Sequence, residues 1–458
     1  MYKLDFNNPI NVFFCGIGGI SMSGLAQVLL DAKFPVSGSD MKQSELTDTL
    51  SNMGAKIYIG QKEDNITNDI DVFVYTAAIR ESHPEFIKAK ELGIPMLTRA
   101  ELLGQIMKNY KLPIAVSGTH GKTTVTSMIS EILMASNMDP TLSIGGILES
   151  IGGNFRIGHS DIFVTEACEY TNSFHSFFPH ASIILNVEED HLDFFKDIND
   201  IRDSFHKFAA LNPADGIVII GGDIDNKEVI LKDIPAKIVT FGLDSSYDYY
   251  ADNISYDKEG KSHFIVHSPQ KDAMEFTLKV PGEHNIKNSL AAIAMCDYLA
   301  VDRANTQKAL SLFGGTKRRF EYKGEVNGIT VIDDYAHHPS EIKATLTAAQ
   351  NYPHNKLWCV FQPHTYTRTK AFMEDFAKAL SLADAVILAD IYAARETDNL
   401  GISSETLKKH IDNLNCECYY LPSFEEIEKF ILKNCAPNDM LITMGAGDVV
   451  NIGNHLVE

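Results

Sequence analysis

The chain has 458 residues, of which 45% are hydrophobic, and its 61 Asp and Glu against 40 Lys and Arg give a net charge of −21. This length and composition supply enough apolar residues for roughly three domains, each with its own core. The acidic balance, with no block of Lys or Arg to offset it, argues against nucleic acid and anionic membrane surfaces as partners.

The amino-terminal sequence and the cysteines indicate a cytoplasmic protein. The opening "MYKLDFNNPINVFF" lacks the basic start and continuous apolar core of a signal peptide, and no apolar run approaches the length of a membrane span. The seven cysteines are scattered without paired metal-type spacing, so we expect reduced thiols.

Strand-like apolar runs alternate with helix-like periodic segments, which is typical of α/β layers built on mostly parallel sheets. In the first unit, residues 1–110, we expect strands at 11–15, 35–40 and 71–78 and a helix at 20–32. The turn "GIGGISMSG" would direct backbone amides at a helix amino end toward an anion, with Asp40 placed to meet a ribose. Ser21 stands where the dinucleotide fingerprint has its third glycine, so a tight turn without a ligand stays an alternative.

The second unit, residues 111–317, opens with an apolar run and then "GTHGKTT" at 118–124, followed by a helical pattern. This resembles a shortened P-loop, because Val116 stands where the usual loop has its first glycine. Gly118 and Gly121 allow the backbone to wrap a phosphate, Lys122 supplies a positive charge, and Thr123 offers a hydroxyl to Mg²⁺. The sequence therefore predicts a nucleotide-phosphate site.

Two further strands of this unit, at 162–167 and 181–187, are followed by polar side chains. Glu166 falls at the end of the first, and His191 follows the second. Because the carboxyl ends of parallel strands line the ligand crevice, both side chains could converge with Thr123 around a metal ion. Taken alone, His191 fits a helix cap or a core position better than a metal site, and only the three such groups after three strands of one unit favour the metal site.

Short alternating runs at 216–220, 236–242, 262–268 and 275–280 predict extra strands attached to this central unit. The segment "PGEHNIKN" then precedes a helix and offers His284, Asn285 and Asn288. These side chains either read a purine edge or cap the helix, and the sequence leaves both open.

In the third unit, residues 318–458, strand-like runs resume at 331–336, 357–363, 385–390 and 440–447. Polar residues gather near the start of this unit and after its strands. Such a group forms either a site between domains or a solvated surface. They are Arg318, Arg319, Asp333, Asp334, His337, His338, His364 and Arg368.

In this order, "GIGGISMSGLA", "GTHGKTT", "EEDH", "GEHNIKNSLAA", "RRFE", "DDYAHHP" and "FQPHTYTRT" resemble the Mur ligase family, ATP-dependent amide-bond ligases of peptidoglycan precursor synthesis. The resemblance covers nearly the whole chain. It implies a Rossmann-like UDP-sugar domain at 1–110, a central P-loop ATPase domain with a mostly parallel sheet plus extra strands at 111–317, and a Rossmann-like C-terminal domain at 318–458.

Within the family, the segments are most similar to the branch that adds L-alanine to the lactyl carboxylate of UDP-N-acetylmuramate through an acyl phosphate. The branch that attaches a cell-wall tripeptide to the same UDP-sugar is the alternative. Outside the family, an oxidoreductase would account only for residues 11–40, and a nucleotide sensor would bind ATP without turning it over. The expected assembly is a monomer or a homodimer.

The resemblance also implies the roles of particular residues. ATP would be bound by Gly118, Thr119, His120, Gly121, Lys122, Thr123, Thr124, Asn285, Arg319 and Asp334. The UDP-sugar would be bound by Gly16, Gly18, Gly19, Ile20, Ser21 and Asp40. Mg²⁺, or Mn²⁺ in its place, would be held by Thr123, Glu166 and His191. L-Alanine would meet Tyr335, His337, His364 and Arg368. The catalytic residues would be Lys122, Arg319 and His337, the last as proton acceptor.

One segment departs from the alanine-adding branch. "EACEY" replaces the "EADES" that is common there, so Cys168 stands where an acid is often found.

Overall fold

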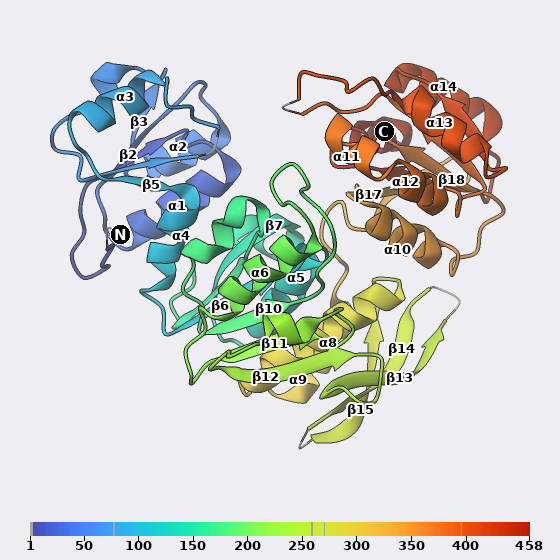
Figure 1. Ribbon diagram of the computed structural model, residues 1–458, viewed down its shortest axis with the longest axis horizontal. Helices are drawn as coiled ribbons and strands as arrows, with labels where there is room; N and C mark the ends of the chain where they lie inside the picture. The colour runs from blue at the N-terminus through green and yellow to red at the C-terminus, as the bar shows by residue number, and fades with distance from the viewer. Residues whose placement is uncertain (1–2, 77, 258–259, 270, 395) are drawn as a thin grey trace.

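The computed structural model describes residues 3–76, 78–257, 260–269, 271–394 and 396–458. In these ranges the chain forms three sheets, of five, ten and six strands. Figure 1 shows the first and last units on either side of the central one, above its sheet. The expected three-unit α/β fold is confirmed, whereas the domain limits at 110 and 317 stay predictions.

The N-terminal sheet has the order β3-β2-β1-β4-β5 and is parallel throughout. All four residues of β1 are buried, because helices cover both faces of the sheet. The expected strand at 71–78 is shorter in the structure, and Ala77 lies outside the described residues. The elements are β1 (Val12–Cys15), α1 (Ile20–Asp31), β2 (Val36–Asp40), α2 (Glu45–Asn52), β3 (Lys56–Ile59), η1 (Glu63–Asn65), β4 (Val72–Tyr75), α3 (Pro84–Glu91), β5 (Met96–Thr98) and α4 (Arg99–Met107).

The central sheet has the order β15-β14-β13-β12-β11-β10-β6-β9-β7-β8. Its strands from β13 to β7 are parallel, and antiparallel strands extend it at both edges, so the expected extra strands are confirmed. The elements are β6 (Leu112–Ser117), α5 (Lys122–Ala135), β7 (Thr141–Leu148), η2 (Glu149–Ile151), β8 (Gly153–Arg156), β9 (Ile162–Glu166), η3 (Tyr170–Ser176), β10 (Ala181–Ile184), α6 (Ile198–Ala209), β11 (Ile217–Gly221), α7 (Lys227–Ile230), β12 (Lys237–Gly242), β13 (Tyr249–Tyr256), β14 (Ser262–Ser268), β15 (Lys271–Leu278), α8 (Glu283–Tyr298) and α9 (Arg303–Leu312).

The strand order of the central sheet creates the candidate site. β6 pairs with β9 on one side and with β10 on the other, in parallel on both sides. The phosphate loop after β6, Glu166 at the end of β9 and the loop after β10 therefore meet at one edge of the sheet.

The C-terminal sheet has the order β16-β17-β21-β18-β19-β20, and only β16 runs antiparallel to its neighbour. Arg368, one of the polar residues expected after a strand, lies in the short helix α11, which begins directly after the Thr365 cap. None of the helices in the described residues is long and apolar enough to cross a membrane. The elements are β16 (Glu321–Val326), β17 (Ile329–Asp334), α10 (Pro339–Ala349), β18 (Leu357–Phe361), α11 (Tyr366–Ala371), α12 (Met373–Leu380), β19 (Ala385–Leu388), α13 (Ser404–Asp412), β20 (Glu417–Tyr420), α14 (Phe424–Asn434), β21 (Met440–Met444) and α15 (Val450–Val457).

Candidate active site

The phosphate loop depends on its two glycines. Gly118 has a φ of +135° and Gly121 a φ of +84°, both in the region that side chains rarely adopt. A Cβ on Gly118 would also lie 2.9 Å from the Cβ of Leu185, and one on Gly121 would lie 2.7 Å from Oδ1 of Asn288. The loop therefore fits closely against its neighbours, with its backbone turned toward the start of α5.

Lys122 is folded back against its own loop. Its ammonium donates to the backbone oxygens of Gly118 and Thr119, the latter at 3.0 Å, and lies 3.0 Å from Oε2 of Glu169. Burial opposes the charge on Lys122, but the nearby Glu169 carboxylate raises the pKa of the ammonium overall. Glu169, which is 3% exposed, is thus a functional partner that the sequence reasoning missed.

The three predicted metal ligands line one cavity of about 510 Å³ together with Lys122. Oε2 of Glu166 accepts a hydrogen bond from Oγ1 of Thr123 at 3.1 Å, and burial raises the pKa of the Glu166 carboxyl. His191 stacks on Tyr170 with ring centroids 4.5 Å apart. The carboxylate and the hydroxyl are the oxygen donors that Mg²⁺ prefers, and the imidazole is a weaker third donor. The donor set fits the ion.

Gly145 in β7 supports this arrangement, although nothing in the sequence marked it. Its backbone N–H donates to Oε1 of Glu166 at 2.5 Å, and a Cβ there would lie 2.5 Å from Oε2 of the same carboxylate. A side chain at position 145 would therefore displace Glu166.

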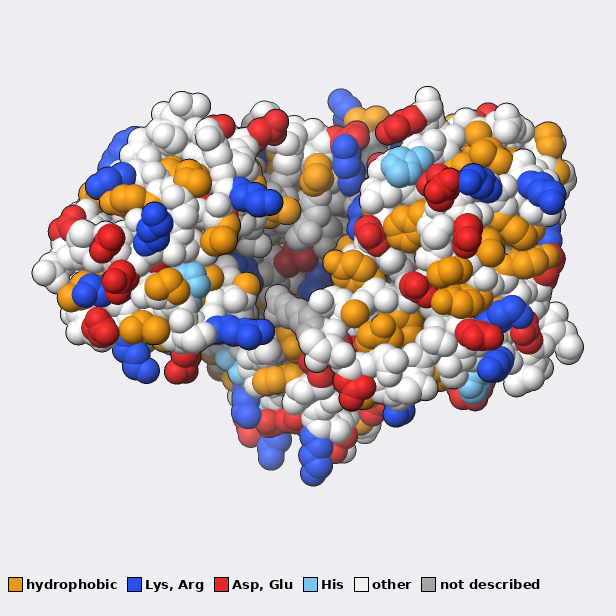
Figure 2. All heavy atoms as spheres, turned by 90° about the horizontal axis from the view of Figure 1, so that it is seen from above, with side chains coloured by type: hydrophobic (Ala, Val, Ile, Leu, Met, Phe, Trp, Pro, Cys, Tyr) orange, Lys and Arg blue, Asp and Glu red, His pale blue; other side chains and the backbone are white. Residues whose placement is uncertain are grey.

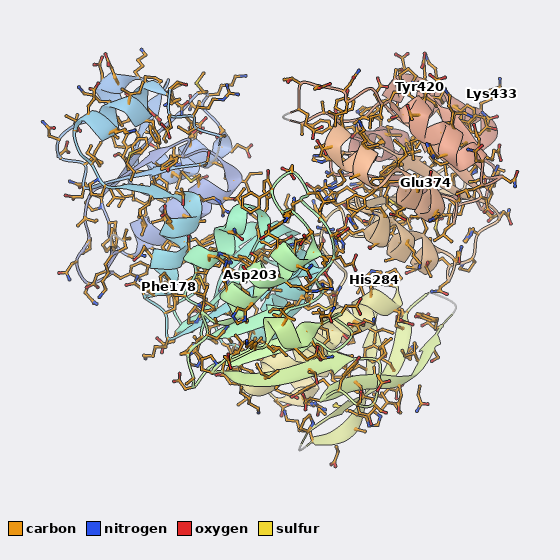
Figure 3. All side chains as sticks on the ribbon, viewed as in Figure 1. Phe178, Asp203, His284, Glu374, Tyr420 and Lys433 are labelled. Carbon is orange, nitrogen blue, oxygen red and sulfur yellow. The ribbon has the colours of Figure 1, made fainter. Side chains whose placement is uncertain are left out.

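A neighbouring cavity of about 250 Å³ lies between the central unit and α10 and is lined by Asn285, Thr124 and Asp334. Asn285 donates to the carbonyl of Pro281 at 2.7 Å. Asp334 accepts the backbone N–H groups of Phe320 and Ala336, both at 2.8 Å, and burial raises its pKa to about 6. His284, at the start of α8 and labelled in Figure 3, lines the same cavity. The polar side chains that line this cavity suit a nucleoside.

Arg319 lines both cavities, so it lies where a nucleoside side and a phosphate side would meet. Its guanidinium carbon is 5.1 Å from the centroid of Tyr335, and its Nη1 is 3.9 Å from Oε1 of Glu341. Figure 2 shows a deep hollow between the two outer units, with charged side chains of both signs at its base.

His120 of the phosphate loop joins the central unit to α10. Its Nδ1 lies 3.1 Å from Oε1 of Glu341, and its Nε2 lies 3.5 Å from Oε2 of Glu188. Burial disfavours the imidazolium, but the two carboxylates raise the pKa of His120 to about 9. Glu188 in turn accepts a hydrogen bond from Ser340 of α10. The loop is thereby tied to the C-terminal unit by charged partners.

The four predicted amino-acid contacts divide between two cavities. Tyr335 and His337 line the phosphate-side cavity, whereas His364 and Arg368 line a neighbouring one. The rings of His337 and His364 lie 5.9 Å apart, so the two pairs remain close.

Arg368 already holds a carboxylate of its own chain. Its Nη2 and Nε lie 2.9 and 3.2 Å from Oδ1 of Asp190, in the loop after β10. Burial by itself would raise the pKa of the Asp190 carboxyl. The charges of Arg368 and His191 outweigh burial and hold this pKa below its usual range. This buried ion pair between the central and C-terminal units is a second feature that the sequence reasoning missed.

The predicted UDP-sugar residues remain in the N-terminal unit and line none of these three cavities. Asp40 accepts the backbone N–H of Gly18 at 2.9 Å, so its carboxylate shapes the glycine turn. Gly16 has a φ of +82°, and Gly19 caps α1. Ile20 is 66% exposed, and Ser21 beside it is exposed as well. The turn thus presents an open surface.

Three family models match the sequence, one for each unit. They are the Mur ligase family catalytic domain at residues 11–111, the Mur ligase middle domain at 116–296 and the Mur ligase glutamate ligase domain at 318–447. Together they account for most of the chain.

Similar proteins align over the full length. UDP-N-acetylmuramate–L-alanine ligase from Agathobacter rectalis is 58% identical over 458 residues, with 100% of both chains covered. The crystal structure of UDP-N-acetylmuramate-alanine ligase from Thermotoga maritima has a TM-score of 0.79 at 31% identity, and that of a murein peptide ligase from Psychrobacter arcticus has 0.69 at 26%, each covering 98% of both chains. This chain belongs to the Mur ligase family.

Proposed function

We propose that the protein is an ATP-dependent ligase that joins L-alanine to the lactyl carboxylate of UDP-N-acetylmuramate. The observation that carries the proposal is the single cavity in which Lys122, Glu166 and Arg319 meet beside a phosphate loop. The full-length identity with an L-alanine ligase supports this choice of substrates.

A carboxylate condenses with an amine only after its oxygen becomes a leaving group, so the reaction begins with phosphoryl transfer. The lactyl carboxylate attacks the γ-phosphate of ATP and forms an acyl phosphate. Lys122 and Arg319 stabilise the negative charge that spreads over the transferred group. Thr123, Glu166 and His191 would hold Mg²⁺, which supplies further charge neutralisation when bound.

The amine of L-alanine then attacks the acyl carbon, and the tetrahedral intermediate collapses to the amide and phosphate. Arg368 offers a planar fork for the α-carboxylate of the amino acid. Burial lowers the pKa of His337 to about 4, so its imidazole is neutral near pH 7. Nδ1 of His337 lies 2.9 Å from the carbonyl of Tyr335 and donates to it, which leaves Nε2 as the acceptor for the amine proton.

ADP release measured over all substrate combinations tests the proposal. We expect release only when ATP, Mg²⁺, UDP-N-acetylmuramate and L-alanine are present together. Release with a cell-wall tripeptide in place of L-alanine would identify the sister ligase instead. ATP binding without turnover under any combination would leave a nucleotide sensor. The cytoplasmic location and the monomeric or dimeric state stay predictions.

A further inference from the structure

A mixed cluster of donor atoms lies in the N-terminal unit, outside the candidate active site. Cys15 ends β1 directly before the glycine turn, and Glu85 and His83 flank the start of α3. Sγ of Cys15 lies 3.1 Å from Oε2 of Glu85 and 3.9 Å from Nδ1 of His83. The ligand atoms of the three side chains all lie within 4.8 Å of one another. Cys15 and Glu85 are fully buried, whereas His83 is half-buried.

Neighbouring polar groups orient these three side chains. Nε2 of Gln61 donates to Sγ of Cys15 at 3.5 Å, so the same amide turns its Oε1 toward Nε2 of His83 at 3.2 Å. His83 then carries its proton on Nε2, and the lone pair on Nδ1 faces the sulfur. The Glu85 carboxylate accepts hydrogen bonds from Ser39 at 2.6 Å and from Asn65 at 2.7 Å. Hydrogen bonds of this kind fix the ligands in protein metal sites.

We propose that Cys15, His83 and Glu85 form a binding site for one zinc-type divalent transition-metal ion. Thiolate, imidazole and carboxylate are the protein ligands that Zn²⁺ takes, and zinc sites with three protein ligands keep their fourth position open. Tetrahedral bonds of the usual lengths would place the ligand atoms roughly 3.5 Å apart. The two separations from Sγ lie on either side of that value, so small side-chain shifts close the site.

The charge balance favours a cation here. The hydrogen-bond partners given above for the Glu85 carboxylate, namely Cys15, Ser39 and Asn65, are neutral donors. A buried carboxylate of this kind is stabilised by a positive charge. When the metal binds, a metal–sulfur bond replaces the S–H bond of Cys15, and the proton leaves to solvent without any redox change. Thiolate, carboxylate and divalent ion then sum to zero charge, and half-buried His83 gives a path of entry.

The other comparable group in the described residues is His120, Glu188 and His338. Nδ1 of His120 is engaged by Glu341, and Nε2 of His338 lies 3.1 Å from the carbonyl of Glu189. Those imidazole nitrogens already serve the contact between units, which leaves the cluster around Cys15 as the better donor set.

Cobalt titration of the full-length protein tests the site. After metal is removed with a chelator, we expect Co²⁺ to produce a thiolate-to-metal charge-transfer absorption that saturates at one equivalent and that Zn²⁺ abolishes. Cys15→Ser should eliminate the band, and Gln61→Ala should weaken the affinity by about 10- to 100-fold. Cys435→Ser, in the C-terminal unit, is the matched control and should leave the band unchanged.

Absence of the band in the unsubstituted protein would overturn the proposal, as would its persistence in Cys15→Ser. Loss of the band in Cys168→Ser alone would overturn it too, because the thiolate would then lie beside the phosphate cavity. Thermal midpoints without metal report whether each variant folds. If Cys15→Ser does not fold, His83→Gln is the deciding variant, because this half-buried position should tolerate an amide. His83→Gln should fold but lose the rise in thermal midpoint that metal produces in the unsubstituted protein.

Discussion

Lys122 donates to its own phosphate loop and pairs with a buried carboxylate, so its substitution tests catalysis and folding together. Lys122→Ala should reduce ADP release by at least roughly 10²- to 10³-fold, the usual loss for one electrostatic donor in a transition state. The variant should still fold, although Glu169 loses its buried cation. Lys227→Ala is the matched control, since Lys227 also donates to a backbone oxygen of the central unit, that of Gly222. Near-normal turnover in Lys122→Ala would reject the assignment of the loop.

Arg368 and Asp190 allow the amino-acid site to be tested from both sides. Arg368→Lys keeps the charge and loses the fork, so it should raise KM for alanine well above any change for ATP or the UDP-sugar. Asp190→Asn removes the internal carboxylate that now occupies the fork, so it should leave KM for alanine unchanged or lower it. Steady-state kinetics with each substrate varied in turn decides this. Equal rises for all three substrates in Arg368→Lys would mean that the residue serves only the contact between units.

At the scale of single elements, the β7–β8 hairpin holds the candidate metal ligand in place. Gly145→Ala should raise the Mg²⁺ concentration needed for half-maximal rate, because its Cβ would push against the Glu166 carboxylate. Gly153→Ala in the same hairpin meets open space and should have little effect. Mg²⁺ titrations of both variants provide the measurement. An equal Mg²⁺ requirement in the two variants would mean that Gly145 does not position Glu166.

The contact between the phosphate loop and α10 should depend on pH. The pKa of His120 is about 9 in the folded protein against a reference value of 6.5. A raised pKa contributes stability that is fully present below pH 6.5 and disappears as the pH rises through 9. The contribution is at most on the order of 3 kcal/mol. The difference in thermal midpoint between the unsubstituted protein and His120→Gln should therefore shrink between pH 6.5 and pH 9. A difference that stays constant over this range would contradict a stabilising role of the charged His120.

The sequence predicted those strands whose apolar runs are continuous, because burial on both faces leaves a clear pattern. β1, β6 and β10 are of this kind. It missed β3, β5, β8, β16 and β20 at sheet edges, where one side of the strand has no partner strand, and it also missed β7 and β13 inside the central sheet. An edge strand such as β16 alternates charged with other residues and resembles a loop.

The site was predictable to the extent that its residues belong to local motifs. The glycines and Lys122 act within one turn of chain, and spacing alone marks them. Glu169 and Asp190 pair with Lys122 and Arg368, which other elements of the fold bring close to them. No spacing in the sequence therefore predicts these pairs. Glu341 is intermediate, because Pro339 and a Glu three residues after His338 form a helix-capping pattern that is visible in the sequence. Its contact with His120 depends on the tertiary fold.

At the scale of the whole molecule, the N-terminal unit touches the central one through a close packing contact. Phe155 of β8 lies against Gly24 of α1, where an added Cβ would come within 2.5 Å of its ring. Gly24→Ala should therefore displace the N-terminal unit and raise KM for the UDP-sugar, with KM for ATP unchanged. The double variant Gly24→Ala, Phe155→Ala should return KM for the UDP-sugar to its original value. Failure of the second substitution to rescue the first would mean that the contact does not position this unit.

The pairing of Arg368 with Asp190 has a consequence for the order of events. Under the proposed assignment, the chain carries a built-in mimic of the amino acid's carboxylate, which the fold holds on Arg368. Free alanine would have to displace this mimic before its amine is aimed at the acyl carbon. Asp190 would then raise the alanine concentration at which the site is half occupied, and release of Arg368 from Asp190 would precede each attack on the acyl phosphate.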